Sequence, residues 1–139
     1  MNYKIAAKYI KDLKFNIPSA KTFFLLAKNI HNYKISIDIK SNQLKKNIVE
    51  VETTLALNQI KNDSEKIDTK ITHSTIIEIE GNMSDKKKLE EIILIKVPAD
   101  IYTEIRQSFV FLFEKSGFKN IKIDENVDFR KLFNQRKIQ

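Results

Sequence analysis

The stretch PADIYTEIRQSFVFLFEKSGF, residues 98–118, carries the clearest structural signal in the chain. Pro98 suits the start of a helix, where its missing N–H needs no partner, and Gly117 suits the left-handed position after a last turn. Between them, apolar side chains recur at steps of three and four residues and so share one face: Ile101, Ile105, Phe109, Leu112 and Phe113. A helix this apolar must be covered on more than one side, which predicts a sheet against it and leaves surface for a second copy of the chain.

Length and composition favour a single domain, residues 1–139, with a sizeable core. Hydrophobic residues make up 42% of the chain and cysteine is absent, so neither a disulfide nor a thiolate metal site is expected. The first residues lack a signal-peptide core, and the longest uncharged apolar runs, residues 92–95 and 109–113, are too short to cross a bilayer. We therefore expect a cytoplasmic protein without direct membrane insertion.

The net charge of +7 raises the question of an anionic partner. Only three of the 25 basic residues are arginine, whose guanidinium forms bidentate hydrogen bonds with phosphates and with guanine edges. The abundance of lysine, isoleucine and asparagine is typical of an AT-rich genome. A nucleic-acid partner is therefore not expected, and a basic nucleic-acid-binding module is the least favoured alternative.

Three segments alternate apolar and polar residues with the period of a half-buried strand. They are residues 33–39, 48–57 and 67–79, rich in isoleucine, valine and threonine, which predicts an antiparallel sheet. Residues 40–47 are polar and predict a turn, and residues 58–66 predict an exposed loop. The spacing of residues 3–15 fits both a helix and a strand, so both remain open on the pattern alone.

Three shorter helical segments are indicated around these elements. Ser19 can cap a turn through Phe23 and Phe24, and Ser84 can cap a helix over residues 85–97, although residues 92–97 also fit an extended chain. Phe129, Leu132 and Phe133 anchor a last helix over residues 127–136. Strands followed by helices predict an α+β fold, a sheet packed on helices.

Residues for catalysis or metal binding are not grouped in the sequence. The two glycines cannot form a phosphate loop, and His31 and His73 lack a second ligand at metal spacing. His73 lies among the apolar positions of its strand, which indicates a hydrogen-bonded structural histidine. No enzymatic activity, metal or cofactor is expected.

Six motifs in consistent order resemble the SecB family of bacterial protein-export chaperones. Residues 9–18, YIKDLKFNIP, are similar to the family's opening Y-x-K-D-[IL]-S-F-E-x-P, and residues 34–51 match its second and third strands in order and spacing. Residues 98–106 resemble the P-x-x-L-F-P-x-x-R start of its main helix, and residues 116–118 its G-[TF]-F stop. Residues 127–133 resemble its closing V-N-F-x-x-[LI]-[YF].

The resemblance implies a four-stranded antiparallel sheet that carries a long helix and a short C-terminal helix. Residues 9–16 would then be a strand, and residues 82–97 a crossover segment rather than a firm helix. The resemblance also implies a homotetramer, a dimer of dimers with the long helices sandwiched between sheets. The long helix has more apolar residues than one sheet can cover, and we interpret the excess as an oligomer interface. Its residues are Ile105, Phe109, Leu112 and Phe113.

The resemblance implies an ATP-independent holdase that keeps unfolded preproteins translocation-competent and delivers them to the SecA motor. Clients would bind long apolar grooves, and affinity would accumulate as one client wraps several protomers. The family's groove positions fall on five residues of this chain: Phe24, Ile67, Ile77, Ile101 and Tyr102.

The SecA-facing positions depart from the family, which is usually acidic there. They fall on Asp12, Asn16 and Lys70, of which only Asp12 keeps a carboxylate. The usual charge complementarity with SecA is therefore mostly absent. This departure favours an alternative in which the chain is a SecB-like chaperone dedicated to one client, such as an antitoxin.

Overall fold

A four-stranded antiparallel sheet forms the body of the protein. The computed structural model describes all residues except 1, 29–32, 60–66, 119–120, 122 and 139, and describes residues 59 and 136–138 by their backbone alone. The strands lie in the order β1-β4-β3-β2 and comprise β1 (Asn2–Asn16), β2 (Tyr33–Lys45), β3 (Ile48–Gln59) and β4 (Asp68–Glu80). The predicted α+β class and antiparallel sheet are confirmed, and the strand interpretation of the first segment is correct.

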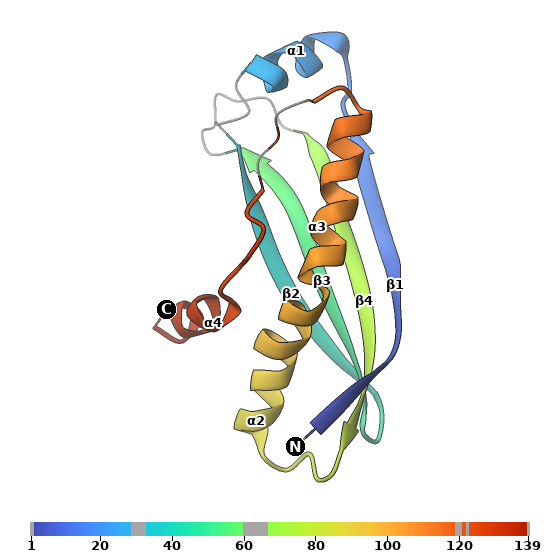
Figure 1. Ribbon diagram of the computed structural model, residues 1–139, viewed down its shortest axis with the longest axis vertical. Helices are drawn as coiled ribbons and strands as arrows, with labels where there is room; N and C mark the ends of the chain where they lie inside the picture. Colours follow the sequence, from blue (N-terminus) through green and yellow to red (C-terminus); the bar gives the residue numbers. More distant parts are fainter. Residues whose placement is uncertain (1, 29–32, 60–66, 119–120, 122, 139) are drawn as a thin grey trace.

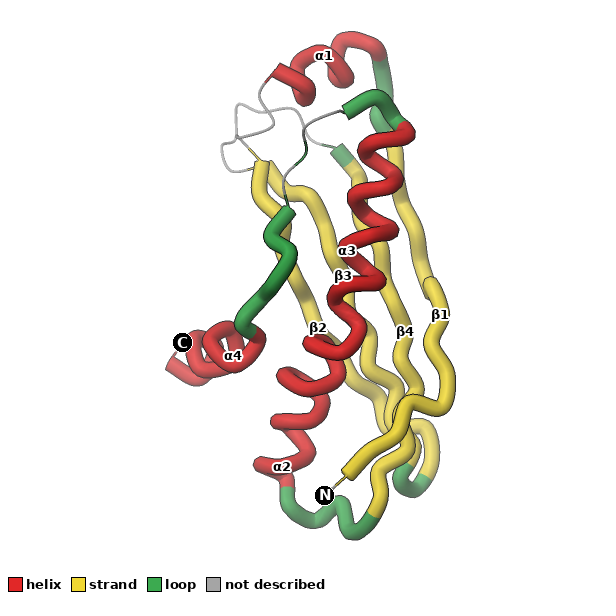
Figure 2. The backbone as a smooth tube through the Cα atoms, viewed as in Figure 1, coloured by secondary structure: helices red, strands yellow, loops and turns green. Residues whose placement is uncertain are grey.

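One helical rod of three segments lies against the sheet. Helix α2 (Lys86–Glu91) continues into the π-helical η2 (Ile92–Lys96) and then into α3 (Val97–Lys115), and Figure 2 shows no break in the rod. Asp85 caps its start, since its Oδ1 accepts the Lys88 N–H at 3.2 Å. Helix α3 itself begins at Val97 with Pro98 in its first turn, close to the predicted start, but it continues an existing helix. The helix predicted over residues 85–97 is confirmed, with Asp85 instead of Ser84 as its cap, and the crossover segment without a firm helix over residues 82–97 is wrong.

The π-helical turn explains how Pro98 fits within the rod. The Val97 N–H bonds to the Ile92 carbonyl, five residues back, which widens the turn just before a residue that has no N–H to donate. The segment is helical because Ile92, Ile93 and Val97 are buried against one end of the sheet. Their partners there are Val49, Val51, Ile77 and Ile79.

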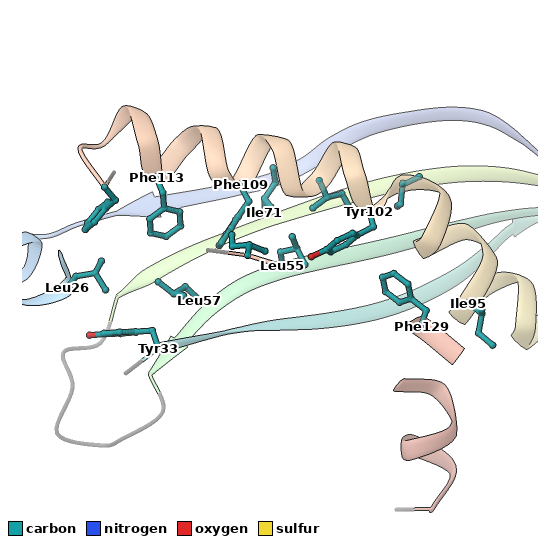
Figure 3. Packing of buried hydrophobic residues seen from close by; sticks show 14 residues of the cluster. Leu26, Tyr33, Leu55, Leu57, Ile71, Ile95, Tyr102, Phe109, Phe113 and Phe129 are labelled. Atoms are coloured by element: carbon teal, nitrogen blue, oxygen red, sulfur yellow. The ribbon is translucent and has the colours of Figure 1, made fainter. Parts of the chain in front are cut away.

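The main core lies between α3 and the centre of the sheet. Phe109 and Phe113 are fully enclosed and pack in one cluster with Leu55 and Ile71 (Figure 3). Each such side chain contributes about 1.5–3 kcal/mol to stability by leaving water. Odd-numbered residues of β3 and β4 supply the sheet side of this core, as the alternation predicts.

The end of α3 follows the predicted glycine stop. Gly117 has φ 100°, and the Phe118 N–H returns to the Phe113 carbonyl at 3.0 Å. A Cβ at Gly117 would lie 3.2 Å from the ring of Phe23. Both the backbone conformation and this close approach therefore require glycine.

The hairpin between β2 and β3 is tighter than predicted. Residues 40–45 continue the strand, with Lys40 opposite Glu52 and Gln43 opposite Val49, and only residues 46–47 turn, with Asn47 at φ 66°. The predicted turn over residues 40–47 is wrong. It was inferred from polar composition, but a strand end in contact with solvent can pair through its backbone without an apolar face. The loop predicted over residues 58–66 falls largely outside the described residues, and residues 58–59 belong to β3.

Two short helices complete the fold, α1 beyond one end of the sheet and α4 at its side (Figure 1). Helix α1 (Ala20–Lys28) lies in the connection between the edge strands β1 and β2, so this segment, not residues 82–97, crosses from one edge of the sheet to the other. Ser19 caps it as predicted, accepting the Thr22 N–H at 3.1 Å. Helix α4 (Phe129–Ile138) is capped by Asp128 and lies beside β2.

Candidate functional site

The single helix α3 leaves apolar positions of the sheet uncovered on both of its flanks. A helix with side chains is about 10 Å across, whereas four strands at about 4.8 Å spacing are nearly twice as wide. Helix α3 packs on β3 and β4. The apolar residues that β1 and β2 carry on the same face therefore border two grooves, one on each side of the helix.

The first groove, here called the α4 groove, lies between β2, η2 and α4. It has a volume of about 160 Å³. Helix α4 is held over it by the Phe129 ring, which meets Tyr102 edge to face at 5.8 Å, and by the ion pair of Arg130 with Glu91. The groove is lined mainly by apolar side chains: Ile37, Ile39, Leu94, Phe129, Leu132, Phe133 and Gln135.

The second groove, here called the β1–α3 groove, lies on the opposite flank and has a volume of about 370 Å³. Its apolar rim is unusually exposed, since Phe111 keeps 56% of its surface, Ile10 49% and Leu13 47%. An exposed apolar patch of this kind is typical of an interaction surface. Ile71, Gln107, Ser108 and Leu112 complete the lining.

A third depression and an exposed aromatic ring lie at the end of the sheet near α1. The depression has a volume of about 410 Å³ and is lined by Asn16, Pro18, Ile67 and Asp68. On α1 itself, the ring of Phe24 is 68% exposed. The apolar surface at this end therefore faces solvent on a helix as well as in a groove.

An aromatic column anchors Phe24 to the core. Its ring contacts Phe23 at 5.4 Å, Phe23 contacts Phe118 at 4.8 Å, and Phe118 contacts Phe113 at 5.5 Å. Edge-to-face and tilted ring pairs at these distances are favourable. The exposed ring is thereby held by side chains that are themselves fixed in the core, which limits the entropy lost when something binds to it.

The five positions predicted to bind clients are divided between surface and core. Phe24 is exposed and Ile67 is half-buried in the third depression, so both present surface to a ligand. Ile77 and Ile101 are enclosed, and Tyr102 is 4% exposed with its hydroxyl donating to the Asp124 carbonyl at 2.6 Å. These three side chains belong to the core and have almost no surface of their own for a client.

The four positions predicted for the oligomer interface are divided in the same way. Ile105, Phe109 and Phe113 have no exposed surface in the protomer, because the chain's own sheet covers them. Leu112 is half-buried and lines the β1–α3 groove beside the exposed Phe111. A partner protomer would therefore contact the groove residues directly, and the three enclosed side chains only through them.

The three positions predicted to face SecA lie together on the side of the sheet turned away from α3, here called the open face. Lys14 of β1 is opposite Lys70 of β4, and Asn16 is opposite Asp68. The ammonium of Lys70 lies 3.8 Å from the Asp12 carboxylate. The one acidic side chain retained at these positions is thus paired within the chain.

A buried glutamate on the open face was not predicted from the sequence. Glu50 is 6% exposed, and its carboxylate accepts hydrogen bonds from Ser74 at 2.7 Å, Tyr9 at 3.1 Å and Lys11 at 3.3 Å. The Ser74 hydrogen bond is the largest of the effects that lower the pKa of Glu50. The alternation of apolar and polar residues in β3 predicts that Glu50 faces solvent. Its burial depends on side chains of β1, which are distant in the sequence, so no local pattern reveals it.

Beneath α3, four buried polar atoms have no hydrogen-bond partner among the described residues. They are the Oγ1 atoms of Thr53, Thr69 and Thr75 and the Nδ1 of His73. The expected buried position of His73 is confirmed, but the hydrogen bond expected for it is absent at Nδ1. Burial is the main cause that lowers the pKa of His73, with Glu104 raising it and Lys8 lowering it further.

The described residues contain no group of three histidine, aspartate or glutamate side chains placed to hold a metal ion. No helix in the part of the chain that the structure describes is long and apolar enough to span a membrane. The chemistry that the site offers is therefore apolar contact at its grooves, with charged side chains at their margins.

Comparisons with known proteins agree with one another. The family model described as preprotein translocase subunit SecB matches residues 1–139. A protein of Pelagibacter ubique (strain HTCC1062), provisionally named protein-export protein SecB, is 36% identical over 135 residues, which are 97% of this chain and 96% of the relative. Protein-export protein SecB 1 of Gluconobacter oxydans (strain 621H) is 21% identical over 149 residues, covering 100% of this chain and 84% of the relative.

A solved structure shares the fold. The SecB-like chaperone of Mycobacterium tuberculosis, in complex with a ChAD peptide from the HigA1 antitoxin, aligns with a TM-score of 0.66 over 90% of this chain and 88% of that one. Sequence identity between the two is 8%. At this identity the likeness shows the fold alone.

The buried His73 predicts a loss of stability in mild acid. Its folded-state pKa lies below the ordinary value of 6.5, so the unfolded chain binds the proton more readily. The stabilising effect of neutral His73 is complete above that ordinary value and is lost as pH falls below it. Urea midpoints measured from about pH 7 to about pH 5 should fall in the wild type and stay nearly level in His73→Gln.

The chain has only one other histidine, which provides a matched control. His31→Gln should keep the wild-type fall in urea midpoint over the same range. A fall that persists in His73→Gln would assign the acid sensitivity to other groups.

Proposed function

The chain belongs to the SecB family, and we propose that it is an ATP-independent holdase that binds unfolded preproteins in its apolar grooves. Family membership and the shared fold give it a chaperone role in protein export. In our proposal it acts in the cytoplasm, keeps clients translocation-competent and catalyses no reaction. The observation that carries the proposal is the exposed apolar surface on a rigid frame, above all the ring of Phe24 at 68% exposure.

Client binding would combine side-chain burial with backbone pairing. An unfolded chain exposes apolar side chains at many positions, and each one that enters a groove leaves water. The outer edges of β1 and β2 have no strand partner in the described sheet, so they can also pair with an extended client. Each contact is weak, and affinity grows as one client reaches several binding sites.

We further propose assembly into a homotetramer through the β1–α3 groove. The exposed side chains of Ile10, Leu13 and Phe111 would be covered by a partner protomer, together with Leu112. Ile105, Phe109 and Phe113 would hold this surface in place from beneath. Assembly would cover this exposed apolar rim and would bring client grooves of several protomers into one particle.

Delivery of clients to SecA is part of the proposal. The surface that would contact SecA is the open face, which contains Asp12, Asn16 and Lys70. The pairing of Asp12 with Lys70 at 3.8 Å leaves little negative charge there for a basic partner. This observation favours the second candidate function, a chaperone dedicated to one client such as an antitoxin. The two candidates share the groove chemistry and differ in the partner of the open face.

Replacement of Phe24 should weaken the holdase activity. Phe24→Ala removes an exposed ring and should lower client affinity about tenfold, because a buried ring is worth at least about 1.4 kcal/mol. Light scattering of a refolding model client, at equal protomer concentrations, should show weaker suppression of aggregation. The melting temperature should change little, since the ring is mostly in water.

Leu44→Ala is the matched control for this variant. Leu44 is 51% exposed near the β2–β3 hairpin and lines none of the grooves described above. Its replacement should leave the suppression of aggregation unchanged. Equal losses in both variants, or no suppression by the wild type, would contradict the proposed client surface.

If the β1–α3 groove is the assembly interface, substitutions of groove residues and substitutions of core residues should have different effects. The wild type should have a solution mass of about four times the 16.3 kDa protomer. Phe111→Asp places a charge in the proposed interface and should lower this mass while the far-UV circular dichroism stays native. Phe109→Asp buries the charge in the core and should unfold the protomer instead. A tetrameric Phe111→Asp variant, or a monomeric wild type, would rule out this interface.

Binding of SecA distinguishes the two candidate functions. Calorimetric titration of the wild type with SecA should give measurable heat if the chain serves general export. In that case, Lys70→Glu, which adds negative charge to the open face, should strengthen the binding. Absence of binding by both forms, with aggregation still suppressed, would leave the dedicated chaperone.

A further inference from the structure

The outward face of α1 combines apolar and positively charged side chains. At about 100° per residue, Lys21, Phe24, Leu25 and Lys28 fall on one side of the helix, and all four are exposed. Thr22 and Leu26 lie on the opposite side and are buried. The surface that α1 presents is therefore two large apolar side chains flanked by two ammonium groups.

No carboxylate in the described part of the chain neutralises the positive charge of this face. The nine residues of α1 include no acidic side chain, and Lys21 and Lys28 form no ion pair with any described residue. The lysines of β1 differ, because three of them pair with carboxylates. Their partners are Glu78 for Lys4, Glu104 for Lys8, and Glu50 and Glu52 for Lys11.

The face is also prepared for binding by its support from below. The aromatic column fixes Phe24 through Phe23 and Phe118, and Leu26 anchors the other side of α1 in the core with 1% exposure. A helix held in this way keeps the backbone positions of its two lysines fixed, about two turns apart, on either side of the apolar pair. A partner that places negative charges on either side of an apolar residue would match both features.

We infer that α1 selects client segments in which aromatic or aliphatic residues are flanked by aspartate or glutamate. The inference rests on the proposed holdase function and adds the chemical class of the segment that α1 holds. The apolar residue of the client covers Phe24 and Leu25, and its flanking carboxylates lie against Lys21 and Lys28. A segment with basic flanks meets the same apolar surface but is repelled at its margins, so charge sets the selectivity while apolar burial gives most of the affinity.

Two peptides of equal length test the inference directly. Both carry the same aliphatic residues and one tryptophan, with aspartate and glutamate flanks in one and lysine flanks in the other. The chain has no tryptophan of its own, so the emission shift of the peptide reports binding without background. The acidic peptide should bind about fivefold to tenfold more tightly at low salt, since each exposed charge pair is worth up to about 1 kcal/mol. The difference should vanish near 1 M salt, where the Debye length is about 3 Å.

Charge reversal on α1 gives the matched comparison. The double variant Lys21→Glu with Lys28→Glu should reverse the preference, so that the basic peptide binds more tightly. The control, Lys86→Glu with Lys87→Glu, changes the net charge by the same amount on exposed positions of α2, at the far end of the molecule (Figure 1). It should keep the preference for the acidic peptide. An equal response of both double variants would overturn the inference, because the preference would then come from net charge.

Failure of the inference can be told from failure of the holdase function. Equal binding of both peptides by the wild type, with aggregation of a refolding client suppressed, overturns the charge selection and leaves the holdase. No binding of either peptide, with no suppression, overturns both. Vesicles of phosphatidylglycerol test the other anionic surface that lysines and apolar residues can bind. Binding to these vesicles that is lost in Phe24→Ala, without binding to either peptide, would make α1 a lipid-contacting helix and overturn the inference.

Discussion

The structure depends on one geometric mismatch, because a single helix covers only part of a four-stranded sheet. Helix α3 gives one face to β3 and β4, with Phe109 and Phe113 enclosed there. The edge strands carry apolar residues on the same face that no helix of the described chain covers completely. Two grooves on the flanks of α3 follow from this packing, and the candidate function follows from the grooves. The same burial that stabilises the protomer therefore determines where apolar surface remains in contact with water.

The open face and the helix-covered face of the sheet handle buried polar groups differently. On the open face, Glu50 has Ser74, Tyr9 and Lys11 as hydrogen-bonding partners. On the covered face, His73 Nδ1 and three threonine hydroxyls lie under α3 without partners among the described residues. Such groups weaken the attachment of a helix to its sheet. The contact between α3 and the sheet is consequently strong at the phenylalanines and weaker in the polar zone of His73 and its threonine neighbours.

Much of the fold could be predicted from local pattern. Alternation in β3 and β4 identified the sheet face that meets α3, and the glycine stop at Gly117 agrees with the observed φ of 100°. The first segment was ambiguous because Tyr9 and Leu13 fit both periods, and pairing with β4 is what makes it a strand. Pro98 predicted a helix start because local rules do not foresee a π-helical turn, which is stabilised here by burial of Ile92 and Ile93 against the far end of the sheet.

The sequence by itself determined the class of fold, the apolar face of α3, the scarcity of catalytic groups and the resemblance to the SecB family. Each of these depends only on residue types and on their spacing along the chain. Tertiary structure alone decided which apolar residues remain exposed. Periodicity shows that Phe109 and Phe111 differ in direction, but the position of the sheet makes one a core residue and the other, at 56% exposure, a surface residue. The positive face of α1 was also decided by tertiary structure, because the folded chain brings no described carboxylate within ion-pair distance of Lys21 or Lys28.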